Sequence, residues 1–169
     1  MILSARNRRE TVDGLSFSGA RFEDFYRGSS PEVFRTLTVV LRDRELAQEA
    51  TDEAMARAYE RWSKVSGYEN PTGWVYRVAL NWARSRLRKR GRERTIHHEP
   101  SLWLDPMPDP ELDAAVAGLP LHQREVIVFR FLLDMTQDQI SEALEIPVGT
   151  VKSRLHRALE TLRKEVRDD

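Results

Sequence analysis

The sequence predicts an all-α protein of two small helical domains joined by a flexible linker. Apolar residues recur at steps of three and four through most of the chain, the period of amphipathic helices, and no segment carries a clear strand pattern. A segment rich in proline and acidic residues, 93–112, interrupts this periodicity. A chain of 169 residues is long enough for two small domains. We therefore expect one domain over 21–92 and another over 113–169.

The composition restricts the classes of function. The chain has no cysteine, which excludes disulfides, thiolate zinc sites and cysteine nucleophiles. No apolar run reaches the length of a signal peptide or membrane span, so we expect a cytoplasmic protein without membrane insertion. Phosphate-binding glycine loops and triad spacings are absent, and His97-His98-Glu99 lies in the linker without further ligands. We expect no catalytic residues, no cofactor and no bound metal.

The zero net charge conceals a segregated charge pattern. Residues 81–94 carry six arginines and one lysine against one glutamate, whereas 99–113 carry five acidic residues and no basic one. Residues 147–167 carry six basic residues against two acidic ones. Two basic patches therefore flank an acidic linker, and such patches are typical of nucleic-acid binding.

Apolar spacing and helix-end residues divide the N-terminal half into a tail and several predicted helices. Residues 1–20 lack apolar periodicity and are interpreted as a flexible tail. Helical spacing over 22–62 predicts two or three helices, with a tight break at Asp43-Arg44. A further helix is predicted over 71–90, with Asn70 as its N-cap and a proline at its first position, where the missing N–H costs nothing.

The segment 136–157 has the pattern of a helix-turn-helix. Thr136 and Gln139 have the spacing of a capping box, and Glu145-Ile146-Pro147 forms the turn before a second helix. The outward face of that second helix is basic near its N-terminus, where a recognition helix contacts bases in the major groove. A solvated basic face is the alternative. The order of capping box, turn, apolar stripe and basic face favours duplex DNA binding.

Residues 119–126 and 147–158 closely resemble region 4 of the extracytoplasmic-function (ECF) sigma factors. The resemblance implies binding to the −35 promoter element and to the β flap of RNA polymerase. The family usually has glycine at the position of Glu145, so a positive φ there would cost strain. The −35 contacts implied by the resemblance are Thr150, Lys152, Ser153, Arg154, His156 and Arg157.

Residues 47–59 are similar to the family's polymerase-binding helix, and residues 71–83 to its −10 helix. From the residues alone, a solvated helix surface is the favoured explanation for the charges of the first segment, and a partner surface is the alternative. The resemblance instead implies that this helix docks on the β′ clamp helices of core polymerase. The residues implied for that contact are Glu49, Asp52, Glu53 and Arg57.

Polar side chains recur along the predicted −10 helix at steps of three and four. Arginines there can neutralise phosphates, and Asn81 offers both a donor and an acceptor to a base edge. Aromatic residues can stack on unpaired bases, although core packing is an equal alternative for Trp74 and Tyr76 and is favoured for Trp82. The −10 contacts implied are Tyr68, Trp74, Arg77, Asn81, Arg84 and Arg88.

The sequence therefore predicts a sigma factor that binds core RNA polymerase and promoter DNA, and that is held by an anti-sigma factor. Strand opening at −10 needs no ATP if the free energy of binding the flipped, unpaired bases exceeds the unstacking cost of a few kcal/mol. One alternative is a stand-alone helix-turn-helix repressor or activator, which would bind a duplex operator without polymerase. A helical adaptor or anti-sigma protein is another, and it leaves the arginine-rich helix unexplained.

Overall fold

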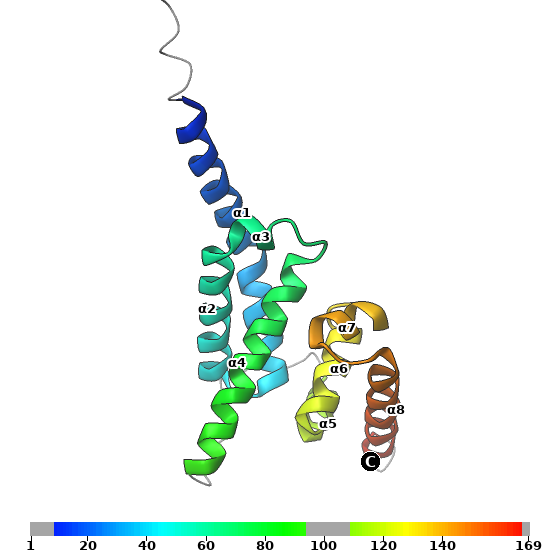
Figure 1. Ribbon diagram of the computed structural model, residues 1–169. Helices are drawn as coiled ribbons and strands as arrows, with labels where there is room; N and C mark the ends of the chain where they lie inside the picture. Colours follow the sequence, from blue (N-terminus) through cyan, green and yellow to red (C-terminus); the bar gives the residue numbers. More distant parts are fainter. Residues whose placement is uncertain (1–8, 94–108, 167–169) are drawn as a thin grey trace, which may run out of the picture.

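The computed structural model describes residues 9–93 and 109–166, which fold into helices and connecting turns without a strand (Figure 1). The predicted all-α fold is confirmed. The N-terminal half contains α1 (Arg9–Leu41), α2 (Arg44–Glu60), α3 (Trp62–Val65) and α4 (Pro71–Glu93). The C-terminal half contains α5 (Pro110–Gly118), α6 (Leu121–Phe131), α7 (Gln137–Leu144) and α8 (Val148–Glu165).

The N-terminal domain is a bundle in which α2 packs against both α1 and α4. The inner face of α2 carries Ala50, Ala54 and Ala58, all fully buried, and these small side chains let the neighbouring helices approach closely. Asp43 caps α2, because its Oδ1 accepts a hydrogen bond from the Leu46 amide at 2.9 Å. The predicted break between the first two helices therefore lies at this cap.

Two helix boundaries differ from the predicted segment limits. Helix α1 begins at Arg9 and so includes residues 9–20, although the sequence there shows no apolar period. Helix α5 begins at Pro110, inside the predicted linker, because Asp109 accepts hydrogen bonds from the next two amides and proline suits the first helical position. The remaining tail, 1–8, and the linker part 94–108, with its His97-His98-Glu99 motif, lie outside the described residues.

The C-terminal domain contains the predicted helix-turn-helix, formed by α7 and α8. Its capping box is present: Thr136 Oγ1 accepts from the Gln139 amide at 3.2 Å, and Gln139 Oε1 accepts from the Thr136 amide at 2.8 Å. Glu145 ends α7 with φ 53°, in the left-handed region. The strain expected for a non-glycine residue at this turn therefore applies.

Replacing Thr136 by alanine should lower the free energy of unfolding by about 1 kcal/mol, because the first turn of α7 loses its side-chain cap. Urea unfolding followed by circular dichroism measures this change. Thr161→Ala is the control, since the Thr161 hydroxyl only donates to the Arg157 carbonyl of its own helix. An equal loss in both variants would show that the capping box has no special role.

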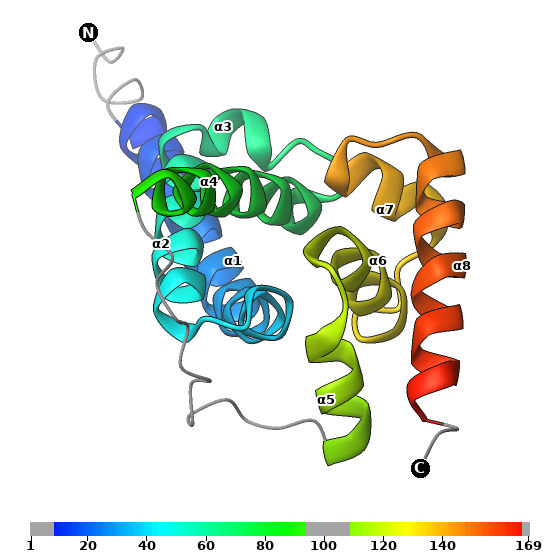
Figure 2. The same cartoon turned by 90° about the horizontal axis from the view of Figure 1, so that it is seen from below.

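The two domains pack directly against each other (Figure 2). Helix α4 contacts α7, and α1 contacts α6, while α8 lies on the side of the C-terminal domain away from the N-terminal bundle. The rings of Tyr76 on α4 and Phe129 on α6 meet with centroids 5.1 Å apart, and both side chains are buried. The domain contact is therefore a packed apolar interface surrounded by polar groups.

Candidate nucleic-acid and polymerase interfaces

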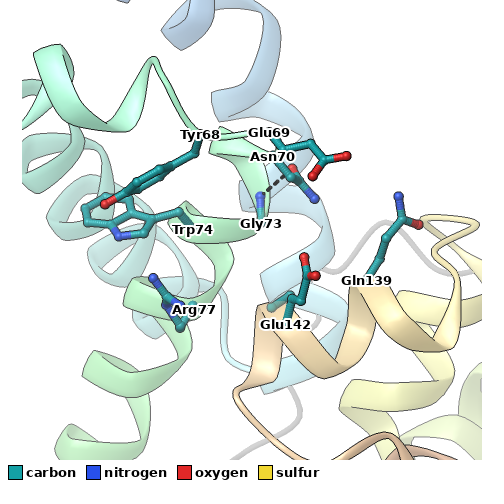
Figure 3. A pocket seen from close by; sticks show the side chains of 9 residues that line it. Tyr68, Glu69, Asn70, Gly73, Trp74, Arg77, Gln139 and Glu142 are labelled. Atoms are coloured by element: carbon teal, nitrogen blue, oxygen red, sulfur yellow. Dashed lines mark hydrogen bonds between the residues drawn. The ribbon is translucent and has the colours of Figure 1, made fainter.

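The start of α4 is held in place by a side-chain cap. Asn70 Oδ1 accepts a hydrogen bond from the Gly73 amide at 2.8 Å (Figure 3), as the sequence predicts. A Cβ atom at position 73 would come within 2.8 Å of Asn70 Nδ2, so glycine is needed there to keep the cap. This cap fixes the direction in which the candidate −10 side chains leave α4.

A pocket of about 340 Å³ lies between the start of α4 and helix α7 (Figure 3). Three of the predicted −10 residues, Tyr68, Trp74 and Arg77, line it together. Its lining is Tyr68, Glu69, Asn70, Gly73, Trp74 and Arg77 from the N-terminal domain, with Gln139, Glu142 and Ala143 from α7. An aromatic pair beside an arginine can stack an unpaired base and neutralise its phosphate.

Farther along α4, the predicted polar side chains contact one another and the C-terminal domain. Arg84 donates to Asn81 Oδ1 at 3.1 Å and to Glu125 Oε1 at 2.6 Å. Arg77 forms an ion pair with Glu145 at 3.1 Å. Arg88 is exposed one turn beyond Arg84. The structure thus brings these candidates onto one side of α4.

Tyr76 belongs to the core. Its side chain is 2% exposed, its hydroxyl donates to Thr36 Oγ1 at 3.2 Å, and its ring packs on Phe129. Burial raises the pKa of the Tyr76 phenol, which therefore stays neutral at physiological pH. Of the two interpretations of this aromatic, base contact is wrong because a buried ring cannot reach a base. Trp82 is half-buried, with the Arg86 guanidinium 5.2 Å from its ring.

Helix α8 has a buried apolar stripe on one side and a basic face on the other. Val151, Leu155 and Ala158 are buried against the domain. Arg154 is partly buried and lines a second cavity, of about 390 Å³, whose other walls include Arg84 and Glu125. The remaining predicted −35 residues are exposed or half-exposed: Thr150, Lys152, Ser153, His156 and Arg157.

The predicted polymerase-binding residues do not share one environment. Asp52 and Arg57 are exposed on the outer face of α2, and Glu53 forms an i, i+4 ion pair with Arg57 at 2.7 Å. Glu49 instead turns toward α4, where its Oε2 lies 3.7 Å from Arg86 Nη2. The outer face available to a partner is therefore centred on Asp52, Glu53 and Arg57.

The sequence did not predict that acidic residues of the C-terminal domain form ion pairs with the −10 candidates. Glu125 is 1% exposed on the inner face of α6, one helical turn before the buried Phe129. Its spacing of four from an apolar core position is a signal that the side chain faces inward. A buried carboxylate needs a charged partner, and Arg84 supplies it.

Two absences are established for the described ranges 9–93 and 109–166. No group of three His, Asp or Glu side chains there could hold a metal ion. In the same ranges no helix is both long and apolar enough to cross a membrane.

The fold and these surfaces define a two-domain helical DNA-binding protein. One domain carries a helix-turn-helix with a basic recognition helix, and the other carries an arginine-rich helix beside an aromatic pocket. Comparison with protein families agrees on both halves: residues 25–93 match the family described as Sigma-70 region 2, and residues 110–162 match Sigma-70, region 4.

The chain belongs to the sigma-70 family of RNA polymerase sigma factors, in the ECF group. It is 32% identical to the ECF sigma factor SigW of Bacillus subtilis over 158 residues, covering 72% of this chain and 76% of that protein. It is 30% identical to the sigma-E factor of Streptomyces coelicolor over 151 residues, covering 86% and 85%.

A solved structure shares the fold. The sigma factor RpoE of Bartonella quintana, crystallised with the anti-sigma factor NepR, superposes with a TM-score of 0.72, covering 88% of this chain and 98% of that one at 19% identity. The likeness therefore extends over both helical domains.

Proposed function

We propose that this sigma factor directs promoter-specific initiation through three surfaces: the outer face of α2 for core polymerase, α4 with its pocket for the −10 element, and α8 for the −35 element. The observation that carries the proposal is the pocket lined by Tyr68, Trp74 and Arg77. It lies at the start of the arginine-rich helix α4, which Asn70 caps. A helix-turn-helix alone would read duplex DNA and has no need for it.

The pocket provides a route to strand opening by binding alone. Base stacking on an aromatic side chain is worth about 1–3 kcal/mol per base, comparable with the cost of unstacking one step. Arg77, Asn81 and Arg84 would hold the phosphates and one base edge next to the pocket. No catalytic activity of the chain is required, and its place of action is the cytoplasm, where polymerase and DNA are.

Its protein partners would be the β′ clamp helices, on the α2 face, and the β flap, on the C-terminal domain. The Bartonella quintana sigma factor was crystallised in complex with the anti-sigma factor NepR. An anti-sigma factor is therefore also proposed as a regulator of this chain.

Reconstituted transcription tests the proposal. Purified chain and core polymerase are incubated with a library of genomic promoter fragments, and the transcripts are sequenced. We expect transcripts that start at a defined distance from a shared bipartite element. Tight binding to duplex operators without polymerase, together with no promoter-specific transcript, would identify a stand-alone repressor or activator instead.

Arg154→Ala and Arg157→Ala should each weaken binding of the polymerase holoenzyme to promoter DNA. A lost phosphate contact lowers the slope of log affinity against log salt by about 1, and a lost base contact costs about 1–3 kcal/mol. Titration at several salt concentrations separates these cases. The control is Arg163→Ala, on the exposed last turn of α8. A loss of core association in either variant would contradict a role confined to DNA.

A further inference from the structure

The second cavity, of about 390 Å³, has the size of a small-molecule site, for which about 300–1,000 Å³ is typical. Residues of α4, α6, α7 and α8 line it, and α6 runs between α4 and α8 (Figure 2). Its lining combines polar side chains with apolar ones: Arg84, His122, Glu125 and Arg154, with Leu121, Leu144 and Ile146. A ligand for this cavity therefore needs both a charged part and an apolar part.

Positive charge dominates the polar side of the cavity. Arg84 is neutralised by Glu125, since the two side chains form an ion pair at 2.6 Å. Arg154 is partly buried, and no carboxylate of the described residues pairs with it. A guanidinium in a partly buried site without a carboxylate favours an anionic ligand, and a phosphate group can accept two parallel hydrogen bonds from it.

The start of α6 adds hydrogen-bond donors to the same side. The first two residues of this 11-residue helix, Leu121 and His122, line the cavity. The N-cap residue, Pro120, makes no side-chain hydrogen bond to the helix. The helix start therefore offers its partial positive charge without a side-chain cap, and His122 adds a ring N–H. Phosphate groups bind at helix starts of this kind.

A buried acceptor without a donor lies at the floor of the cavity. Glu125 lines the cavity although it is only 1% exposed. Its Oε1 accepts from Arg84, whereas its Oε2 has no hydrogen-bond partner within the described residues. Burial of an unpaired carboxylate oxygen is unfavourable, so a ligand N–H at this floor would be stabilising. The ligand should therefore carry N–H or amino donors as well as an anionic group.

We propose that this cavity binds a nucleoside monophosphate. The phosphate would lie against Arg154, His122 and the start of α6, which are the groups suited to an anion. The base would lie along the apolar side chains of Leu144 and Ile146, with its N–H edge toward Glu125. This class of ligand joins a phosphate, a flat ring with apolar faces and N–H donors in one molecule.

Nucleotide binding would affect the proposed promoter contacts. Arg84 and Arg154 are among the residues proposed for the −10 and −35 elements, so bound nucleotide and promoter DNA would compete for them. This competition rests on the proposed function, whereas the binding site itself does not. His122 lines the cavity and is not one of the proposed promoter contacts, so its substitution tests the cavity alone.

Isothermal titration calorimetry of the full chain, without polymerase or DNA, tests the site. The probes are AMP, GMP, CMP and UMP, with inorganic phosphate and the unphosphorylated nucleosides for comparison. We expect saturable binding of at least one nucleoside monophosphate, and binding of phosphate or of its nucleoside that is weaker by about tenfold or more, because each offers only part of the contacts. No saturable binding of any nucleoside monophosphate, or equally tight binding of inorganic phosphate, would overturn the proposal.

His122→Glu places a second carboxylate in the cavity and should weaken nucleotide binding by about tenfold or more. An acidic residue in the first turn suits a helix start, so α6 should persist in circular dichroism. The control Arg163→Glu changes the charge of α8 by a larger amount, at an exposed position outside the cavity, and should leave nucleotide binding unchanged. An equal loss in both variants would indicate nonspecific attraction of anions and overturn the site.

Competition with DNA is measured separately. The calorimetric titration is repeated in the presence of a promoter duplex that carries the sequence found by transcription, and we expect the nucleotide affinity to fall. Unchanged affinity at saturating duplex would contradict competition for Arg84 and Arg154. Failure of transcription by the unsubstituted chain is a distinct result, which contradicts the proposed function and not the nucleotide site.

Discussion

Asn81→Ala is expected to reduce formation of open promoter complexes by about 10- to 100-fold, because a hydrogen-bonded base contact is worth about 1–3 kcal/mol. The side chain is exposed on α4, and its Oδ1 also accepts from Arg84 Nη1 at 3.1 Å. The alanine variant therefore loses a base-reading group and an acceptor that orients a phosphate-binding arginine. Binding to core polymerase should hardly change, since Asn81 lies on a different helix from the proposed docking face.

Permanganate reactivity of unpaired thymines measures opening, and a binding titration with labelled core polymerase measures docking. The matched control is Lys89→Ala, an exposed residue on the same helix outside the proposed contacts. Asn81→Asp sharpens the test, because it keeps the size of the side chain but places a negative charge against the DNA. A parallel loss of docking and opening in Asn81→Ala would contradict base reading by this residue.

The helix-turn-helix and most helix ends could be predicted because their signals are local. Asn70 before Pro71 caps α4, and Thr136 with Gln139 forms the capping box of α7, each within four residues of the helix start. The strain at Glu145 is expected for another reason, the resemblance to a family that usually has glycine at this position, and the residue has a φ of 53°. Such features depend little on the rest of the fold.

The domain contact could not be predicted, because helical periodicity separates inner from outer faces without showing what covers the outer one. Arg84 follows the outward spacing of α4, but its carboxylate partner Glu125 lies 41 residues away on another domain. Tyr76 is also buried only where α1, α4 and α6 meet. The candidate −10 residues were therefore identified by type and spacing, while their partners required the tertiary structure.

Reversing two charges on α2, Asp52→Lys with Glu53→Lys, should weaken binding to core polymerase by about 100-fold. If Asp52 and Glu53 contact core polymerase as proposed, reversing both charges removes the electrostatic complementarity of that contact at a cost of several kcal/mol, and each 1.4 kcal/mol is a factor of ten in affinity. Asp52 is exposed and Glu53 is partly exposed beside Arg57, so the substitutions alter the surface without disturbing the buried alanine stripe. Competition against a labelled sigma factor on core polymerase measures the loss, and promoter-specific transcription should fall with it.

Glu32→Lys on exposed α1 is the matched charge reversal and should leave binding unchanged. Glu49→Lys gives the sharper comparison, because Glu49 faces Arg86 across the α2–α4 contact at 3.7 Å. A lysine there sets two partly exposed cations against each other across the α2–α4 contact, so its main effect should be a lower unfolding midpoint. If Glu49→Lys instead left stability intact and abolished docking, while the Asp52 and Glu53 reversals did not, the polymerase surface would lie on the α4 side of α2.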